Sequence, residues 1–291
     1  MELRQLSLEE FGELFPRQFC VYDTPRFCAL NATKAEDVGA FTLFDDHGQA
    51  LLGQVFGLRG GIWRAPYSAP YSFPSGNAID RIPDFYSLLK EKLGPIHLSF
   101  PPQAYLPCEA PAIGQRTDEA NFHYPIERFA DYELYLSRSG RYSHHRALKH
   151  DFRFEKTDDI ARAYGIIAEN RRAMGYPLAM SLEQVVETVQ LVKADFFVLS
   201  LDEHDLASAM IYHVRPGVVQ VIYWGDLPEA RQYRAMNHLA YRVFLWYAEN
   251  QPDVKIVDIG PASTDGIRNE GLCQFKLSIG CIETPKPIYS L

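Results

Sequence analysis

The sequence has neither a secretory signal nor a hydrophobic run long enough to cross a membrane. Its start, Met1-Glu2-Leu3-Arg4, lacks the charged segment and the apolar segment that together make such a signal. Its nearly apolar stretches, such as Val218–Trp224, are far shorter than the ~18 residues that a bilayer requires. We therefore expect a cytoplasmic protein with no membrane span.

Cysteine is scarce and unpaired in sequence. The five cysteines form no Cys-x-x-Cys motif, and they are Cys20, Cys28, Cys108, Cys273 and Cys281. An odd, scattered set indicates reduced thiols rather than a disulfide framework. The chain also lacks a Walker phosphate loop, a Gly-x-Ser-x-Gly elbow and a Ser-His-Asp order, so it offers no motif for those chemistries.

Positive charge is in deficit. The formal net charge of −8 argues against a surface built throughout for nucleic acid, although it leaves room for a local basic patch. Hydrophobic residues make up 47% and aromatic residues 13% of the chain, which is enough for ordinary packed cores. A length of 291 residues corresponds to about two domains.

One pattern occurs twice. Residues 51–101 and residues 206–261 each predict a strand, a glycine turn, a second strand, a long loop, an amphipathic helix and a final strand. The two copies end at Pro101 and Pro261. Two copies of one pattern indicate a duplicated domain rather than a solenoid.

In the first half, turn and capping residues set the predicted elements. A helix begins after Ser7, and a second helix ends at Gly94. Residues 101–125, which hold five prolines, predict a loop. The predicted helices are 8–15 and 82–93, and the predicted strands are 26–31, 40–44, 50–58, 62–67 and 96–100.

The second half predicts two helices, a strand meander, a helix and a strand. Ser181 and Gln184 form a capping box, and Asp159 lies in the cap of the preceding helix. The predicted strands are 196–201, 207–214, 218–224 and 255–259, and the later helix is 236–250. Before them, residues 132–153 predict a helical connector.

This order, together with several short segments of the second half, resembles the GNAT acyltransferase superfamily, and its duplication resembles the tandem FemAB-like group. The segments that carry the resemblance are Tyr223-Trp224-Gly225, Asn237-His238-Leu239, Asp258-Ile259-Gly260, the run from Asn269 to Lys276, and Ile279-Gly280-Cys281. The resemblance implies an α+β fold of two tandem GNAT-like domains, each a mostly antiparallel mixed sheet flanked by helices. We predict domains over 1–130 and 156–291, joined by a basic connector over 131–155.

In GNAT enzymes, the loop before the corresponding helix binds the pyrophosphate of coenzyme A (CoA). Free backbone N–H groups and the helix dipole attract the anion there. The resemblance implies such a site at Arg231, Gln232, Arg234, Ala235 and Asn237, although both glycines of the usual motif are missing. The matching loop of the first half, residues 68–78, has no arginine or lysine, so we expect no second pyrophosphate site. The implied co-substrate is acyl-CoA, with no metal.

Five further residues complete the predicted site. The resemblance implies that Lys276 contacts the acyl donor or stabilises developing negative charge. Asp258 and Asp226 end neighbouring strands and are candidate bases for the attacking amine. Tyr223 and Trp224 are candidate lining of the acyl slot, although core packing explains them better.

The connector carries five basic residues against one acid from Arg138 onward. A basic stripe of this kind fits either a solvated face or contact with tRNA. Three function classes therefore stay open. The first is an N-acyltransferase that moves an acyl group from acyl-CoA to a small-molecule or peptide amine. The second is an aminoacyl-tRNA-dependent transferase of the FemAB type, and the third is a binding protein without turnover.

Overall fold

The computed structural model describes residues 1–291 and divides into two compact units. The first unit comprises Met1–Ala120, Ser263–Ile267 and Thr284–Leu291, and the second comprises Asn121–Ala262 and Arg268–Glu283. The first boundary between the units therefore lies at residue 120, whereas the sequence predicted boundaries at 130 and 155. Residues 131–155 lie inside the second unit. The last eight residues return to the first unit, so its sheet is completed by both ends of the chain.

The first unit is built on one mixed sheet, with strand order β1-β2-β3-β4-β6-β15, and β5 pairs with β3. Its elements are β1 (Glu2–Leu6), α1 (Leu8–Leu14), α2 (Pro25–Leu30), β2 (Asp37–Phe44), β3 (Ala50–Arg59), β4 (Ile62–Ala65), β5 (Ser75–Gly76), α3 (Ile82–Leu93), β6 (Ile96–Ser99), the start of β7 (Gln115–Pro125) and most of β15 (Ile282–Ser290). The short strands β13 (Ser263–Thr264) and β14 (Ile267–Arg268) form a separate two-stranded sheet.

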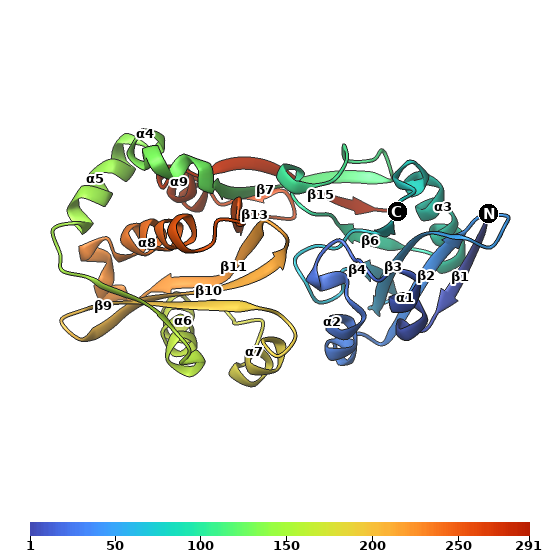
Figure 1. The fold of residues 1–291 in the computed structure, drawn as a ribbon, viewed down its shortest axis with the longest axis horizontal. Helices are drawn as coiled ribbons and strands as arrows, with labels where there is room; N and C mark the ends of the chain where they lie inside the picture. Colours follow the sequence, from blue (N-terminus) through green and yellow to red (C-terminus); the bar gives the residue numbers. More distant parts are fainter. The chain divides into compact units, whose positions relative to one another are not determined.

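Alternation along β2 and β3 gives this sheet two apolar faces. Phe41 and Phe56 pack in the cluster that contains the buried side chains of α3. Their neighbours Ala40 and Val55 pack on the opposite face with Phe11 of α1. Successive residues of a strand point to opposite faces, so helices cover both faces of these strands (Figure 1).

The second unit has its own strand order, β7-β12-β11-β10-β9-β8. Its elements are the end of β7, α4 (Tyr132–Tyr135), α5 (Arg138–Ala147), β8 (Arg153–Thr157), α6 (Ile160–Met174), α7 (Leu182–Thr188), β9 (Ala194–Leu201), β10 (His204–Arg215), β11 (Val218–Asp226), α8 (Ala235–Asn250), β12 (Ile256–Pro261) and α9 (Glu270–Ser278). Helices α6 and α8 lie on opposite faces of β9, β10 and β11 (Figure 1). Short 3-10 turns elsewhere in the chain cover 21–23, 32–34, 79–81, 103–105, 126–131 and 228–233.

The predicted repeat is confirmed by the topology of each unit. In the first, β3 pairs antiparallel with β4, and β4 pairs parallel with β6 after the helix α3. In the second, β10 pairs antiparallel with β11, and β11 pairs parallel with β12 after the helix α8. Each unit therefore contains the same arrangement of a hairpin, a crossover helix and a parallel strand.

Two predicted elements are wrong. Residues 26–31 form helix α2 rather than a strand, because Thr24 caps the helix by accepting a hydrogen bond from the Phe27 backbone and Pro25 occupies the first turn. Residues 115–125 form β7 rather than a loop. That strand pairs with β12, and it buries the alternating Phe122 and Tyr124.

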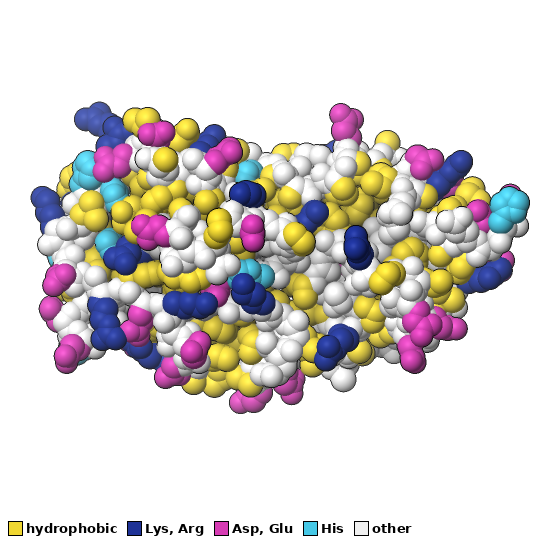
Figure 2. Space-filling view, in the orientation of Figure 1, with side chains coloured by type: hydrophobic (Ala, Val, Ile, Leu, Met, Phe, Trp, Pro, Cys, Tyr) yellow, Lys and Arg dark blue, Asp and Glu magenta, His cyan; other side chains and the backbone are white.

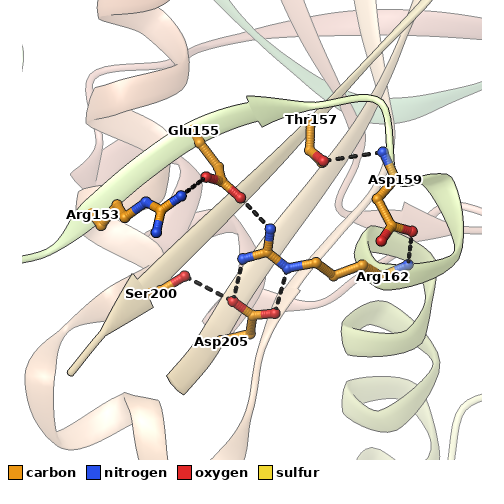
Figure 3. A network of polar contacts seen from close by, with 7 residues as sticks. All are labelled: Arg153, Glu155, Thr157, Asp159, Arg162, Ser200 and Asp205. Carbon is orange, nitrogen blue, oxygen red and sulfur yellow. Dashed lines mark hydrogen bonds and ion pairs between the residues drawn. The ribbon is translucent and has the colours of Figure 1, made fainter. Parts of the chain in front are cut away.

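The predicted connector is only partly helical. Its helices are α4 and α5, and at Arg153 the chain enters β8. Figure 3 shows how polar contacts hold this edge strand, since Arg162 of α6 reaches both Glu155 of β8 and Asp205 of β10. The guanidinium of Arg162 therefore links the edge strand β8 to helix α6 and to strand β10 of the same sheet.

Candidate functional site

Strands β11 and β12 pair only over their first residues. The parallel ladder runs from Val218 opposite Ile256 to Gln220 opposite Asp258, while β11 continues to Asp226 and β12 to Pro261. A bulge in β11 follows, because Met210 faces Tyr223 and the next residue of β10 faces Val221. A bulge bends its strand and re-aims the side chains beyond it. Trp224 and Asp258 thus lie on neighbouring strands of one sheet, and the ladder between these strands ends at Asp258, before it reaches Trp224.

Asp258 is fully buried where that ladder ends. Its carboxylate accepts hydrogen bonds from Asn121 Nδ2 at 2.7 Å, Gln220 Nε2 at 2.7 Å and the Gly260 backbone N–H at 3.1 Å. The three donors come from three strands, namely Asn121 from β7, Gln220 from β11 and Gly260 from β12 itself. Three charge-assisted bonds of this kind hold β7, β11 and β12 together. This geometry favours a supporting role for Asp258 and leaves it little room to meet an amine.

Lys276 of α9 braces the same strand end. Its Nζ donates to the carbonyl oxygens of Ile259 at 2.9 Å, Gly260 at 2.8 Å and Pro261 at 2.9 Å. Gly260 has a φ of +74°, a left-handed conformation that favours glycine, and it turns the chain at the centre of these three carbonyls. Burial lowers the pKa of the ammonium to about 8. All three N–H groups of Lys276 are engaged, so stabilising an oxyanion would require the exchange of one carbonyl.

Asp226 differs from Asp258, because no protein side chain donates to its carboxylate. It ends β11, is 9% exposed and has a pKa raised to about 6 by burial, with Arg231 acting in the opposite direction. Its backbone carbonyl is held at 2.6 Å by Asn170 of α6. A fixed carboxylate that ionises near neutrality and keeps free acceptor sites has the properties of a general base.

The loop before α8 presents an uncapped helix start. Arg234 adopts a left-handed conformation with a φ of +61° and occupies the N-cap position, where no side chain bonds the helix. Gln232 instead donates to the carbonyl of Glu229 at 3.2 Å. Ala235 is buried, while Arg231 and Arg234 are exposed beside this helix start. Free N–H groups of the first turn, next to two guanidinium groups, suit an anion.

Tyr223 and Trp224 are half-buried. The Tyr223 hydroxyl accepts a hydrogen bond at 3.1 Å from the backbone N–H of Ala179. The Trp224 ring meets the edge of the Phe275 ring of α9, with their centroids 6.3 Å apart. The predicted residues thus form two groups: Trp224 and Asp258 with α9 and Lys276, and Asp226 with the loop of Arg231 and Arg234. Asn237 lies in the first turn of α8.

The sequence reasoning missed the partners of these residues. Gln220 is a polar residue inside an apolar strand, and that break in the pattern is the signal for a buried hydrogen bond. Asn121 and Asn170 carry no such signal, because only the fold brings them to Asp258 and Asp226.

A second buried carboxylate also went unpredicted. Asp195 is 1% exposed and accepts bonds from His213 Nε2 at 2.6 Å and the Tyr247 hydroxyl at 2.8 Å, and it pairs with Lys156 Nζ at 2.7 Å. Burial would raise the pKa of Asp195, but these three partners outweigh it and lower the pKa to about 2. Both carboxylate oxygens therefore contact a partner, which favours a structural role for this cluster at the start of β9.

The sequence predicts a basic stripe along the connector, and helix α5 exposes several of its residues. Arg138, Arg141 and Arg146 of α5 are exposed, as is Lys149 just after the helix. His144 is buried against the Tyr241 ring, with their centroids 4.7 Å apart. Figure 2 shows basic and histidine side chains at the end of the second unit that carries α4 and α5. No helix combines the length and the apolar character needed to cross a membrane.

Comparisons with known proteins show the fold. No family model matches the sequence, and no curated protein sequence matches it. Among solved structures, FemX matches with a TM-score of 0.64 and 12% identity, over 100% of this chain and 98% of that one. The C-terminal domain of a protein named as a lysylphosphatidylglycerol synthetase of Agrobacterium fabrum matches with a TM-score of 0.61 and 13% identity, over 97% and 90%.

A tandem GNAT protein of the clavulanic acid biosynthesis pathway matches with a TM-score of 0.57 and 9% identity, over 100% of this chain and 98% of that one. The coverage is almost complete on both sides in all three comparisons, so the likeness extends to both units. The chain therefore has the tandem GNAT fold, in the form that FemX also adopts.

Proposed function

We propose that the protein transfers an acyl group from acyl-CoA to an amine. The observation that carries this proposal is that β11 parts from β12 in the second unit. Beyond this point, β11 leads through a short 3-10 turn to the uncapped start of α8. A thioester placed along β11 would set its carbonyl near the strand end and its pyrophosphate at the helix start. The fold likeness to a tandem GNAT protein supports this use of the second unit.

Asp226 supplies the base in this mechanism. An amine attacks only in its neutral form, and the Asp226 carboxylate takes up the proton that the nitrogen loses as the N–C bond forms. The tetrahedral intermediate then collapses, the C–S bond breaks, and CoA leaves as a thiolate that takes up a proton. Positioning of the amine against the thioester supplies much of the remaining rate enhancement.

Binding of acyl-CoA can be tested by thermal unfolding with CoA, acetyl-CoA and longer acyl-CoAs. Ligand at 100 times its dissociation constant adds about 2.7 kcal/mol to the free energy of unfolding. The double variant Arg231→Ala/Arg234→Ala should weaken binding about tenfold or more, because two charge-assisted contacts are removed. Arg172→Ala, on the exposed part of α6, is the matched control and should bind as the unaltered protein does.

If no thioester in the panel stabilises the protein, the acyl-CoA proposal is wrong. If a thioester does bind, release of free thiol in the presence of an amine panel distinguishes an enzyme from a binding protein. Binding without thiol release would indicate that the two missing glycines of the loop have left a GNAT-shaped binding protein.

A second candidate is transfer from aminoacyl-tRNA, and the exposed basic face of α5 favours it. The fold likeness to FemX adds to this reading. Binding of tRNA through this face must weaken steeply with salt, because each neutralised phosphate releases counterions. Arg138→Ala/Arg146→Ala should reduce both the affinity and the salt dependence. Affinity that does not change with salt would exclude tRNA as the donor carrier.

A further inference from the structure

The first unit holds a polar cavity on one face of its sheet. The cavity has a volume of about 460 Å³ and is lined by side chains of β4, β6, β7 and β15, by the loop 66–70 and by Asp265 and Gly266. All of these residues belong to the first unit. The proposed acyl transfer assigns no role to this cavity, so a ligand bound here would be independent of that function.

Strand alternation makes the cavity polar. On β6, Ile96 and Leu98 are buried in the core beneath α3, so His97 and Ser99 face the other way, into the cavity. On β15, Tyr289 belongs to the same core, while Ser290 lies opposite His97 and lines the cavity. Interior strands of a sheet that is covered on both faces are apolar on both. Here one face is polar and concave, which is the character of a ligand site.

Two guanidinium groups stand at one end of the cavity. Arg64 lies beside His97 in the sheet and has no acidic partner, and Arg59 makes one hydrogen bond at 2.9 Å to the backbone carbonyl of Tyr67. Both also line a second opening of about 680 Å³ that contains Lys34. Burial and the charge of Arg59 lower the pKa of Lys34. Glu36, the acid in that opening, already accepts a bond from the Gly60 backbone at 2.7 Å.

The negative charges that line the cavity are Glu119 of β7 and Asp265. Lys286 and Glu119 neutralise each other in a largely buried ion pair of 2.8 Å. Asp265 remains, because no protein group pairs with its carboxylate. Its backbone is left-handed, with a φ of +52°, an arrangement that is strained for a residue other than glycine.

His97 lies where the two charges meet. Burial, Arg64 and Lys286 lower its pKa, while Asp265 and Glu119 act in the opposite direction. Both Arg64 and Asp265 therefore act on one imidazole, yet they form no ion pair with each other. Two unpartnered charges of opposite sign across one cavity are complementary to a molecule that carries both.

We propose that this cavity binds a small zwitterion, an amino acid or short peptide, with its carboxylate at Arg59 and Arg64 and its ammonium at Asp265. A guanidinium fork binds a carboxylate through two parallel hydrogen bonds. The ammonium then meets the carboxylate that lacks a partner. Arg64 is partly buried, whereas Arg59 and Asp265 are exposed at the rim of the cavity. A site that recognises both ends binds a molecule that lacks either end more weakly, because one charge-assisted contact is lost.

Calorimetric titration of the full chain tests the proposal, with the twenty common amino acids and a set of glycyl and alanyl dipeptides as probes. At least one probe should bind. Its N-acetyl form and its C-terminal amide should each have an affinity lower by about tenfold or more. Arg64→Met and Asp265→Asn should each weaken the zwitterion about tenfold. Arg26→Met, an exposed arginine of α2 outside the cavity, should change nothing.

The pattern of loss across the variants decides the outcome. Arg64→Met should bind the zwitterion and its C-terminal amide equally weakly, and Asp265→Asn should do the same with the zwitterion and its N-acetyl form. Equal binding of the zwitterion and its N-acetyl form by the unaltered protein would overturn the proposal in favour of a simple anion site. No binding across the panel would also overturn it, whatever the acyl-CoA experiment shows. Circular dichroism of both variants separates a lost contact from a lost fold.

Discussion

At the scale of single residues, two aspartates of neighbouring strands have different surroundings, one at the end of β11 and one within β12. Asp258 accepts three hydrogen bonds inside the sheet, whereas no other residue's side chain donates to the buried carboxylate of Asp226, whose pKa is raised to about 6. The sequence makes them equivalent candidates for a base. Burial and hydrogen bonding act on a carboxylate in opposite directions, so only the positions of the partners distinguish them.

For Asp226, we expect a pH-dependent transfer rate. The base works only when ionised, so activity should be lost as the pH falls through about 6 and should reach a plateau above it. Asp226→Asn should lower kcat by about 100-fold or more and abolish that step in the profile. The measurement is kcat/KM against pH, with Asp253→Asn, an exposed residue, as control. A step near pH 6 that survives in the variant would assign the base elsewhere.

For Asp195, we expect a pH-dependent stability. Its folded pKa of about 2 lies below the ~3.9 of an unfolded aspartate, so its contribution is present above pH 4 and is lost as the pH falls toward 2. The shift corresponds to about 2 to 3 kcal/mol. Urea unfolding should show Asp195→Asn destabilised at pH 7, with the difference narrowing below pH 4. A constant difference from pH 7 to pH 2 would contradict this role.

At the scale of elements, edge strand β8 depends on a polar network. Arg162 of α6 donates to Asp205 through Nε at 2.7 Å and Nη2 at 2.6 Å, and it also donates to Glu155 of β8 (Figure 3). These side chains are about a quarter to a third exposed, so solvent weakens the ion pairs. The bidentate geometry nevertheless orients the strand.

Arg162→Met should therefore loosen β8 more than the rest of the second unit. We expect a loss of about 1 kcal/mol in the free energy of unfolding, together with faster amide exchange over Arg153–Thr157. Hydrogen exchange with peptide resolution reads both regions in one experiment. Arg172→Met, on the exposed side of the same helix, controls for the loss of a charge. If exchange rises equally in β8 and β10, the network does not hold this edge selectively.

At the scale of the whole molecule, the two units share one topology but differ in the charge of the loop before the crossover helix. Both units contain a hairpin, a crossover helix and a parallel strand. The loop before α3 has no arginine or lysine over residues 68–78, and Arg81 at the start of α3 is paired with Asp80 and Asp84. The loop before α8, in contrast, carries Arg231 and Arg234. A pyrophosphate needs such charges or free N–H groups.

We therefore expect one acyl-CoA site in each chain. Titration calorimetry should give a stoichiometry near one, and Arg231→Ala/Arg234→Ala should abolish or weaken that single event. Two equivalent binding events would show that the first unit also binds the thioester and would contradict the assignment of donor binding to the second unit.

The sequence by itself determined the regular elements that follow from local chemistry. Ser7 and Ser181 capped their helices as predicted, and the repeated pattern of strand, turn, strand and helix appeared in both units. These features follow from side-chain caps, turn residues and periodicity, which act over a few neighbouring residues.

Tertiary structure alone decided the rest. Strand β7 forms because β12 offers it a partner from far along the chain, and the end of β15 completes the sheet of the first unit. In the same way, Lys276 became a brace because Gly260 turns three carbonyls toward it, and Arg64 and Asp265 came to face one cavity. Pairing, burial and charge proximity are set by distance in space, and one sequence records distance along the chain only.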